Sequence, residues 1–124
     1  MTAAAHIRVE RQADILLVTP LATITALTNG GLAAEWAGVQ NQALGGAIRH
    51  IVVDLREIPY FGSSFLEWLV QLWNQVKKNG GRLAICNAST IAAEVIHLAR
   101  LNTVWTIANS SAEALAALRL ADAT

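Results

Sequence analysis

Residues 50–73 read HIVVDLREIPYFGSSFLEWLVQLW and contain, in order, a strand pattern, a turn and a helix pattern. The largely apolar run at 51–55 is rich in β-branched residues, which is typical of a strand buried on both faces of a parallel sheet. Pro59 and Gly62 then interrupt both strand and helix. Beyond them, apolar residues recur at helical spacing, at Phe65, Leu69, Leu72, Trp73 and Val76. The stretch therefore predicts a strand in the middle of the sheet, a short loop and a helix over about 63–78.

Two adjacent hydroxyls, Ser63 and Ser64, stand where this predicted helix begins. The segment from Ser64 to Glu67 matches the capping box S-x-x-E, in which the serine oxygen accepts an amide proton of the first turn and the glutamate reaches back. Capping explains one serine but not two. The free amides and the dipole of a helix N-terminus also stabilise an anion, so this position suits a phosphate. We therefore take Ser63 and Ser64 as candidate phosphorylation sites.

The composition places limits on the class of protein. With 124 residues, the chain is long enough to form a single domain, residues 1–124, without disulfides or metals. Nine basic and nine acidic residues cancel, so no charge excess favours nucleic acid or an anionic membrane as a partner. No apolar run reaches the roughly 20 residues of a membrane span, and the first residues lack the apolar core of a secretory signal. We expect a cytoplasmic protein whose only cysteine, Cys86, is buried and inert.

The remaining residues alternate between strand and helix patterns. Residues 7–11 and 15–18 predict an N-terminal hairpin that turns at Ala13 and Asp14. Further strands are expected within 21–27, at 82–86 and at 104–107, and further helices from Thr28 or Asn29, from Ser89 or Thr90, and from Ser110. The predicted fold class is α/β: a mixed β-sheet with a parallel centre and an N-terminal antiparallel hairpin, covered by about four helices.

Three of these helices are expected to turn specific apolar residues toward the sheet. For the helix after residue 28 these are Leu32, Trp36, Val39 and Ala43. For the helix after residue 89 they are Ile91, Val95, Leu98 and Ala99. For the last helix they include Ala114, Leu115 and Leu118.

The sequence contains no recognisable catalytic or metal-binding motif. His6, His50 and His97 are far apart in sequence, and none has a partner at the spacing of a metal site or a catalytic pair. Asp54 and Glu57 follow the central strand, where two carboxylates on one loop are usually solvated. We therefore expect no catalytic residues, no metal and no cofactor, and a protein that is not an enzyme.

Trp68 lies at the margin of the apolar arc of the helix over 63–78, next to Gln71 and Gln75. One hypothesis is that Trp68 is partly exposed and anchors a partner, as aromatic residues at interfaces often do. The equally weighted alternative is that Trp68 covers the edge of the sheet. Trp73 is expected at the centre of the arc.

Residues 48–115 resemble the STAS domain of bacterial anti-sigma factor antagonists, and the similarity extends over roughly residues 7 to 120. The family's Asp-Ser-(Ser/Thr)-Gly turn corresponds to residues 62–65, which read GSSF, so Gly62 and Phe65 depart from it. The family's acidic residue near the phosphoacceptor has no counterpart in residues 21–24, LATI. The segments 79–81, NGG, and 98–101, LARL, follow the family's usual pattern.

The resemblance implies a protein-binding function. It places the phosphoacceptor at Ser63. The candidate partner-binding residues are Gly62, Ser63 and Ser64 of this turn, together with Trp68 from its place on the helix. The implied partner is an anti-sigma factor that is also a serine kinase, which binds the unmodified domain and loses it on phosphorylation. The alternative is a STAS adaptor or transport-associated subunit that binds partners without a switch, and a small-ligand or enzymatic role ranks third.

Overall fold

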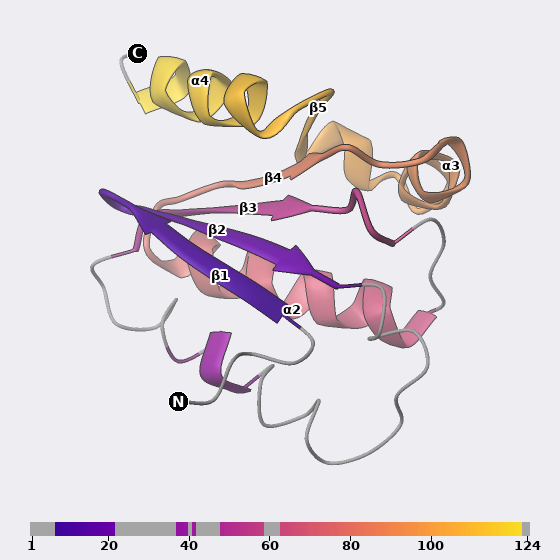
Figure 1. Ribbon diagram of the computed structural model, residues 1–124, viewed down its shortest axis with the longest axis horizontal. Helices are drawn as coiled ribbons and strands as arrows, with labels where there is room; N and C mark the ends of the chain where they lie inside the picture. The colour runs from indigo at the N-terminus through magenta and orange to yellow at the C-terminus, as the bar shows by residue number, and fades with distance from the viewer. Residues whose placement is uncertain (1–6, 22–36, 40, 42–47, 59–62, 123–124) are drawn as a thin grey trace.

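Five strands form one mixed sheet in the order β1-β2-β3-β4-β5 (Figure 1). The computed structural model describes residues 7–21, 37–39, 41, 48–58 and 63–122. The strands are β1 (Ile7–Gln12), β2 (Ile15–Pro20), β3 (His50–Asp54), β4 (Leu83–Cys86) and β5 (Thr106–Ala108). β1 pairs with β2 in an antiparallel hairpin, and the three other pairings are parallel. The predicted mixed sheet, with its antiparallel hairpin and parallel centre, is confirmed.

β3 lies in the middle of the sheet, and all five of its residues are buried. Ile51 and Val53 pack into the larger core cluster, which contains the apolar side chains of α2 (Ser63–Lys78). Val52 points to the opposite face and packs in a second cluster with residues of α4 (Ser111–Asp122). Figure 1 shows α2 and α4 on the two sides of the sheet. Because both faces are covered, the strand is a continuous apolar run, as predicted.

The other described helices are α3 (Thr90–Leu98) and the 3₁₀ helix η2 (Leu101–Thr103), and residues 37–39 and 41 are also helical. Two predicted caps are present. Ser89 Oγ accepts a hydrogen bond from the amide of Ala92 at 3.1 Å. Ser110 Oγ accepts one from the amide of Glu113, also at 3.1 Å. Each satisfies one of the backbone donors that a helix N-terminus leaves free.

The predicted inward face of α3 is wrong. Ala92 and Ile96 are buried, whereas Ile91 is 59% exposed and Leu98 is 75% exposed. α3 has apolar residues on both faces, so periodicity alone could not decide which face packs inward. The tertiary contacts select the buried face of α3. The helix packs mainly beside η2, and one stripe of residues at positions i and i+4, Ala92 and Ile96, is enough to form that contact.

The other predicted inward faces have different outcomes. In α4, Ala114 and Leu118 are buried and Leu115 packs partly buried against them, which confirms that prediction. Val39 is buried, as predicted for the helix after residue 28. Leu32, Trp36, Ala43 and the strand expected within 21–27 lie outside the described residues.

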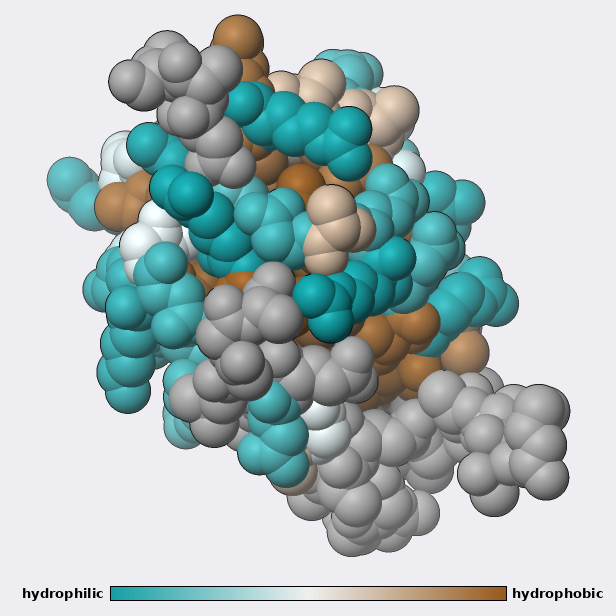
Figure 2. All heavy atoms as spheres, turned by 90° about the vertical axis from the view of Figure 1, so that its left-hand side faces the viewer, coloured by the Kyte–Doolittle hydropathy of each residue, from teal (hydrophilic) through white to brown (hydrophobic). Residues whose placement is uncertain are grey.

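The surface at the amino ends of the parallel strands is mainly hydrophilic over its described part (Figure 2). Within the part of the chain that the structure describes, no helix combines the length and the apolar character needed to cross a bilayer.

Candidate functional site

The carboxyl ends of β3, β4 and β5 meet at one edge of the sheet and are followed by polar residues. Asp54 ends β3, Asn87 follows β4, and Asn109 follows β5. The N-termini of α2, α3 and α4 lie at the same edge, because each helix follows one of these strands (Figure 1). Parallel α/β sheets generally bind their ligands at this edge. This edge is therefore the candidate site.

Asp54 is the centre of the polar contacts at this edge, although it is only 3% exposed. Its Oδ1 accepts hydrogen bonds from the backbone amide of Arg56 at 3.0 Å and from Nδ2 of Asn87 at 3.1 Å. Its Oδ2 accepts one from Nε of Arg56 at 2.9 Å, and Nη2 of Arg56 lies 2.8 Å away. A buried carboxylate needs such partners, because an unpaired charge would be costly to desolvate.

The prediction that Asp54 is solvated is therefore wrong. The missing information was tertiary: Asn87 lies 33 residues further along the chain, and the pairing of β3 with β4 brings it to Asp54. Asn87 itself has a φ of 56°, in the left-handed region that asparagine tolerates better than most residues. The D-x-R spacing and an asparagine just after the next strand were the signals in the sequence.

The two neighbours of Asp54 have shifted acid–base properties. The hydrogen bond to Asp54, and then its negative charge, raise the pKa of the Arg56 guanidinium. Burial, followed by the charge of Asp54, raises the pKa of the Cys86 thiol to about 12. Cys86 is buried and forms no disulfide. The predicted burial of Cys86 is confirmed. Its raised pKa agrees with the prediction of an inert thiol, because the thiolate is the reactive form.

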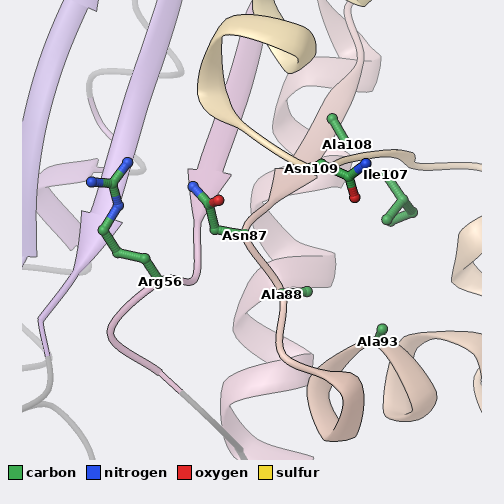
Figure 3. Close-up of a pocket in the computed structure, with 7 residues that line it drawn as sticks. All are labelled: Arg56, Asn87, Ala88, Ala93, Ile107, Ala108 and Asn109. Atoms are coloured by element: carbon green, nitrogen blue, oxygen red, sulfur yellow. The ribbon is translucent and has the colours of Figure 1, made fainter.

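A groove with a volume of about 490 Å³ opens beside this network (Figure 3). We call it the strand-end groove, and it is lined by Arg56, Asn87, Ala88, Ala93, Ile107, Ala108 and Asn109. Its residues come from the ends of three strands and the first turn of α3. The sequence did not reveal it, because the lining segments are far apart in the chain, from Arg56 to Asn109, and join only through strand pairing.

The two candidate phosphorylation sites start α2. Ser63 is the first residue of the helix and Ser64 the second, in agreement with the predicted start, and Lys78 is the last, as predicted. For α3 and α4 the capping serine is the residue before the helix, and in α2 that residue is Gly62, which lies outside the described residues. The side chains of Ser63 and Ser64 lie outside the described part of the structure, so the capping-box interpretation of Ser64 stays a prediction. The first turn of α2 contains no acidic residue.

Trp68 is 4% exposed, so the hypothesis that it is partly exposed is wrong. It belongs to the larger core cluster, and its ring centroid lies 5.6 Å from that of Phe65. Among the described side chains of α2, the buried ones are Trp68, Leu69, Leu72 and Val76, so the inward stripe is rotated toward Trp68 relative to the predicted arc. Trp68 is therefore a core residue in this structure.

Trp73 instead lies at the flank of this stripe and is partly buried. Its ring meets that of Trp105 edge-on, with centroids 6.2 Å apart. Lys77 Nζ lies 3.9 Å from the centroid of the Trp73 ring, within the range of a cation–π contact. Trp73 was predicted at the centre of the apolar arc, and that prediction is wrong. Trp73 lies at the flank of the buried stripe, and Trp68, predicted at the margin, is buried.

The described histidines have no geometry of a catalytic or metal site. His50 is fully buried, and its Nδ1 accepts a hydrogen bond from the backbone amide of Arg82 at 2.9 Å. His97 is exposed on α3, and His6 lies outside the described residues. Among the residues that the structure describes, no group of three or more histidine, cysteine or acidic side chains could hold a metal ion.

Comparison with known proteins supports one family. The family of the STAS domain matches residues 6–114. The fold superposes on a STAS-domain anti-sigma-factor antagonist from Planctomyces limnophilus with a TM-score of 0.80 and 28% identity, covering 93% of this chain and 99% of that chain. No curated protein gives a significant match.

Two further solved structures share the fold. The anti-sigma factor antagonist SpoIIAA in its unphosphorylated form superposes with a TM-score of 0.75 and 15% identity, covering 91% of this chain and 96% of that chain. The Bacillus cell fate determinant SpoIIAA in its phosphorylated form superposes with a TM-score of 0.67 and 15% identity, covering 88% and 96%. The family match over most of the length, together with this shared fold, shows that the chain belongs to the STAS domain family.

Proposed function

We propose that this STAS domain is an anti-sigma factor antagonist that docks on an anti-sigma factor with serine kinase activity and is released when Ser63 is phosphorylated. The observation that carries the proposal is the position of Ser63 as the first residue of α2, at the carboxyl edge of the central strand. The solved structures of the same fold include SpoIIAA in both unphosphorylated and phosphorylated forms. In this proposal the protein is a cytoplasmic regulator of transcription and not an enzyme.

The physical basis of the switch is local electrostatics. The first backbone amides of α2 point out of the helix and, with its dipole, favour a negative group at Ser63. No acidic residue in the first turn of α2 opposes that group. A phosphate there adds nearly two negative charges to a surface that docks only when it is desolvated, so it weakens binding through desolvation cost and like-charge repulsion.

A second candidate function is a STAS adaptor or transport-associated subunit that binds its partner without phosphorylation. The specific observation in its favour is that Gly62 occupies the place of the family's acidic residue before the acceptor. A kinase that reads this acid would not recognise the turn. The two candidates share the docking surface and differ only in the modification of Ser63.

The proposal is tested by recovering the protein and its partners from native lysate, adding ATP, and locating phosphate by mass spectrometry. We expect phosphate on Ser63 in the wild type and in Ser64→Ala, and none in Ser63→Ala. Ser63→Ala should still bind the partner, whereas the phosphorylated wild type should be released.

Ser64→Ala is the matched control because it removes the adjacent hydroxyl from the same helix turn. Retained binding with no phosphate on Ser63, in the presence of the partner kinase and ATP, would replace the switch with the adaptor function. Phosphate on Ser64 alone would move the acceptor by one residue.

A further inference from the structure

β5 is the last strand of the sheet, and β4 is its only neighbouring strand in the described structure (Figure 1). Its sequence, Thr106–Ala108, is short and uncharged, and Ile107 is 42% exposed although it lies on a strand. An edge strand leaves backbone N–H and C=O groups without a partner, and these groups can pair with a strand of another chain. We call the side of β5 that faces away from β4 the outer side of β5.

The register of the sheet determines which residue turns its backbone groups to this outer side. The amide of Leu55 donates to the carbonyl of Cys86 at 2.9 Å, so the backbone groups of Cys86 point to β3. Successive residues of a strand point their backbone groups to opposite sides, so those of Ile85 point to β5. Ile85 pairs with Ile107 in a parallel register, and the residue opposite a hydrogen-bonded one points the other way. The N–H and C=O of Ile107 are therefore directed to the outer side.

Among the described residues, no hydrogen bond of a turn, loop or cap involves these two groups of Ile107. Trp105, two residues earlier, also points its backbone groups to the outer side, but its amide donates to the carbonyl of Leu101 at 2.8 Å. The accessible part of the outer side therefore begins at Ile107 and continues to Asn109, which is exposed.

The charge pattern favours a second copy of this chain as the occupant of this side. Residues 101–112, LNTVWTIANSSA, contain no charged side chain, so nothing here attracts a charged partner or repels an identical strand. The opposite edge strand of the sheet is different, because β1 carries Arg8, Glu10 and Arg11, which are all exposed. Charges of this kind protect an edge strand against pairing. Self-association by strand pairing is therefore favoured at β5 and disfavoured at β1.

We propose that the chain forms a two-fold symmetric dimer in which two β5 strands pair antiparallel about Ile107. In this register each Ile107 N–H donates to the C=O of the other Ile107, so one pair satisfies both groups. The two Ile107 side chains lie on the same face of the joined sheet and cover each other's apolar surface. A two-fold contact uses the same strand in both copies, so assembly stops at the dimer. The dimer depends neither on Ser63 nor on its modification.

The test is sedimentation-velocity ultracentrifugation of the full chain over a range of concentrations. The contact is small, because β5 has three residues, so we expect a monomer–dimer equilibrium with a dissociation constant on the order of 100 μM. Amide hydrogen exchange, followed by NMR, reports on the same contact. Exchange of the Ile107 amide should slow as the concentration rises, whereas that of Ala108, whose N–H points to β4, should change little.

Two substitutions act on the outer side without removing a hydrogen bond to β4. Ile107→Pro deletes the outward N–H, and an edge strand tolerates proline at such a position. Ile107→Lys places two like charges opposite each other across the symmetry axis. Each should raise the dissociation constant at least about tenfold. Ile91→Lys makes the same charge change at an isoleucine of α3 that is 59% exposed, and as the matched control it should leave the equilibrium unchanged. The dispersion of the amide spectrum checks the folding of each variant.

A wild-type chain that stays monomeric up to about 1 mM would overturn the proposal. A dimer that persists in both Ile107 variants, when their spectra show an intact fold, would place the interface elsewhere. Loss of the dimer in Ile91→Lys alone would assign the contact to α3. A series of species larger than the dimer would indicate a head-to-tail contact instead of a two-fold one.

Discussion

Asp54 and Arg56 form a two-point ion pair in which the carboxylate side chain is 4% exposed and the guanidinium side chain is 59% exposed. Nε and Nη2 of Arg56 lie 2.9 Å and 2.8 Å from the same oxygen, Oδ2, and Oδ1 is occupied by the Arg56 amide and by Asn87. Because of this difference in exposure, the two residues have different roles. Asp54 joins the ends of β3 and β4 through buried contacts, while Arg56 presents charge to solvent.

Replacing Asp54 with Ala should lower the free energy of unfolding by about 1–3 kcal/mol, because the amide of Asn87 and the backbone amide of Arg56 lose their acceptor. The loss stays below the roughly 3–5 kcal/mol of a fully buried ion pair, since the exposed guanidinium can turn to water. Urea denaturation measures the change. Glu57→Ala removes the other carboxylate of the same loop and is the control, which should change stability by less than about 0.5 kcal/mol. Equal effects of the two variants would contradict the role assigned to Asp54.

The inward face of α3 can be checked by two alanine substitutions on one helix. Ile96→Ala empties a fully packed position and should cost about 2–5 kcal/mol. Leu98→Ala removes a side chain that is 75% exposed and should cost less than about 0.5 kcal/mol. Chemical denaturation of both variants distinguishes the observed face from the one expected from periodicity. A larger loss of unfolding free energy for Leu98→Ala than for Ile96→Ala would favour the inward face predicted from the periodicity.

Cys86 should make stability depend on pH in the alkaline range. Its folded pKa, about 12, lies above the ordinary thiol value of roughly 8.5 because the side chain is buried beside Asp54. Below pH of about 8.5 the thiol is neutral in both states, and its contribution is complete. Above that pH the unfolded chain loses the proton first, so the stabilisation is lost progressively as pH rises toward the folded value.

Urea midpoints at pH 7, 9 and 11 should therefore fall less steeply for Cys86→Ala than for the wild type, each compared with its own value at pH 7. Other groups that titrate in this range are common to both proteins and cancel in the comparison. Alkylation by iodoacetamide at pH 8 should be slow in the folded protein and rapid in urea. Parallel pH profiles of the two proteins, or rapid alkylation of the folded state, would contradict the raised pKa.

Gly81 is required by a close backbone contact. A Cβ at this position would overlap the carbonyl group of Arg49, and backbone atoms cannot move aside as a flexible side chain can. Gly81→Ala should therefore destabilise the fold by about 1–3 kcal/mol, as overpacking does. Gly38→Ala is the matched control, because it lies in a helical segment and nothing stands within 4 Å of the position that its methyl group would take. It should be neutral or stabilise by up to about 1 kcal/mol. Thermal denaturation of the two variants gives the comparison, and similar melting temperatures would contradict the contact.

Local patterns were sufficient for the elements at the centre of the fold. The apolar run in β3 is typical of a strand covered on both faces, and the spacing after Ser63 is typical of a helix. The helix was predicted with its observed bounds, and the strand, predicted at 51–55, was displaced by one residue. The serines before α3 and α4 were likewise identified, because capping depends on residues within one turn.

The choice of face was less predictable where apolar residues occur on more than one side. α3 buries Ala92 and Ile96 instead of Ile91 and Leu98, and α2 buries Trp68 more deeply than Trp73. The inward stripe is rotated by some tens of degrees in α2 and by about one residue, roughly 100°, in α3. Periodicity over a helix with apolar residues on several sides does not resolve such a rotation. The positions of η2 and Trp105 against these helices resolve it in the folded chain.

The sequence by itself determined the order of the described strands and α-helices, the two-sided burial of β3 and the place of Ser63 at a helix start, since these depend on neighbours within a few residues. Only the tertiary structure decided that Asp54 is buried, that Asn87 reaches it, and that Arg56 and Ile107 line one groove. The pairing of β3, β4 and β5 joins segments far apart in the chain, and the burial of a polar side chain depends on whether such a segment supplies its hydrogen-bond partner.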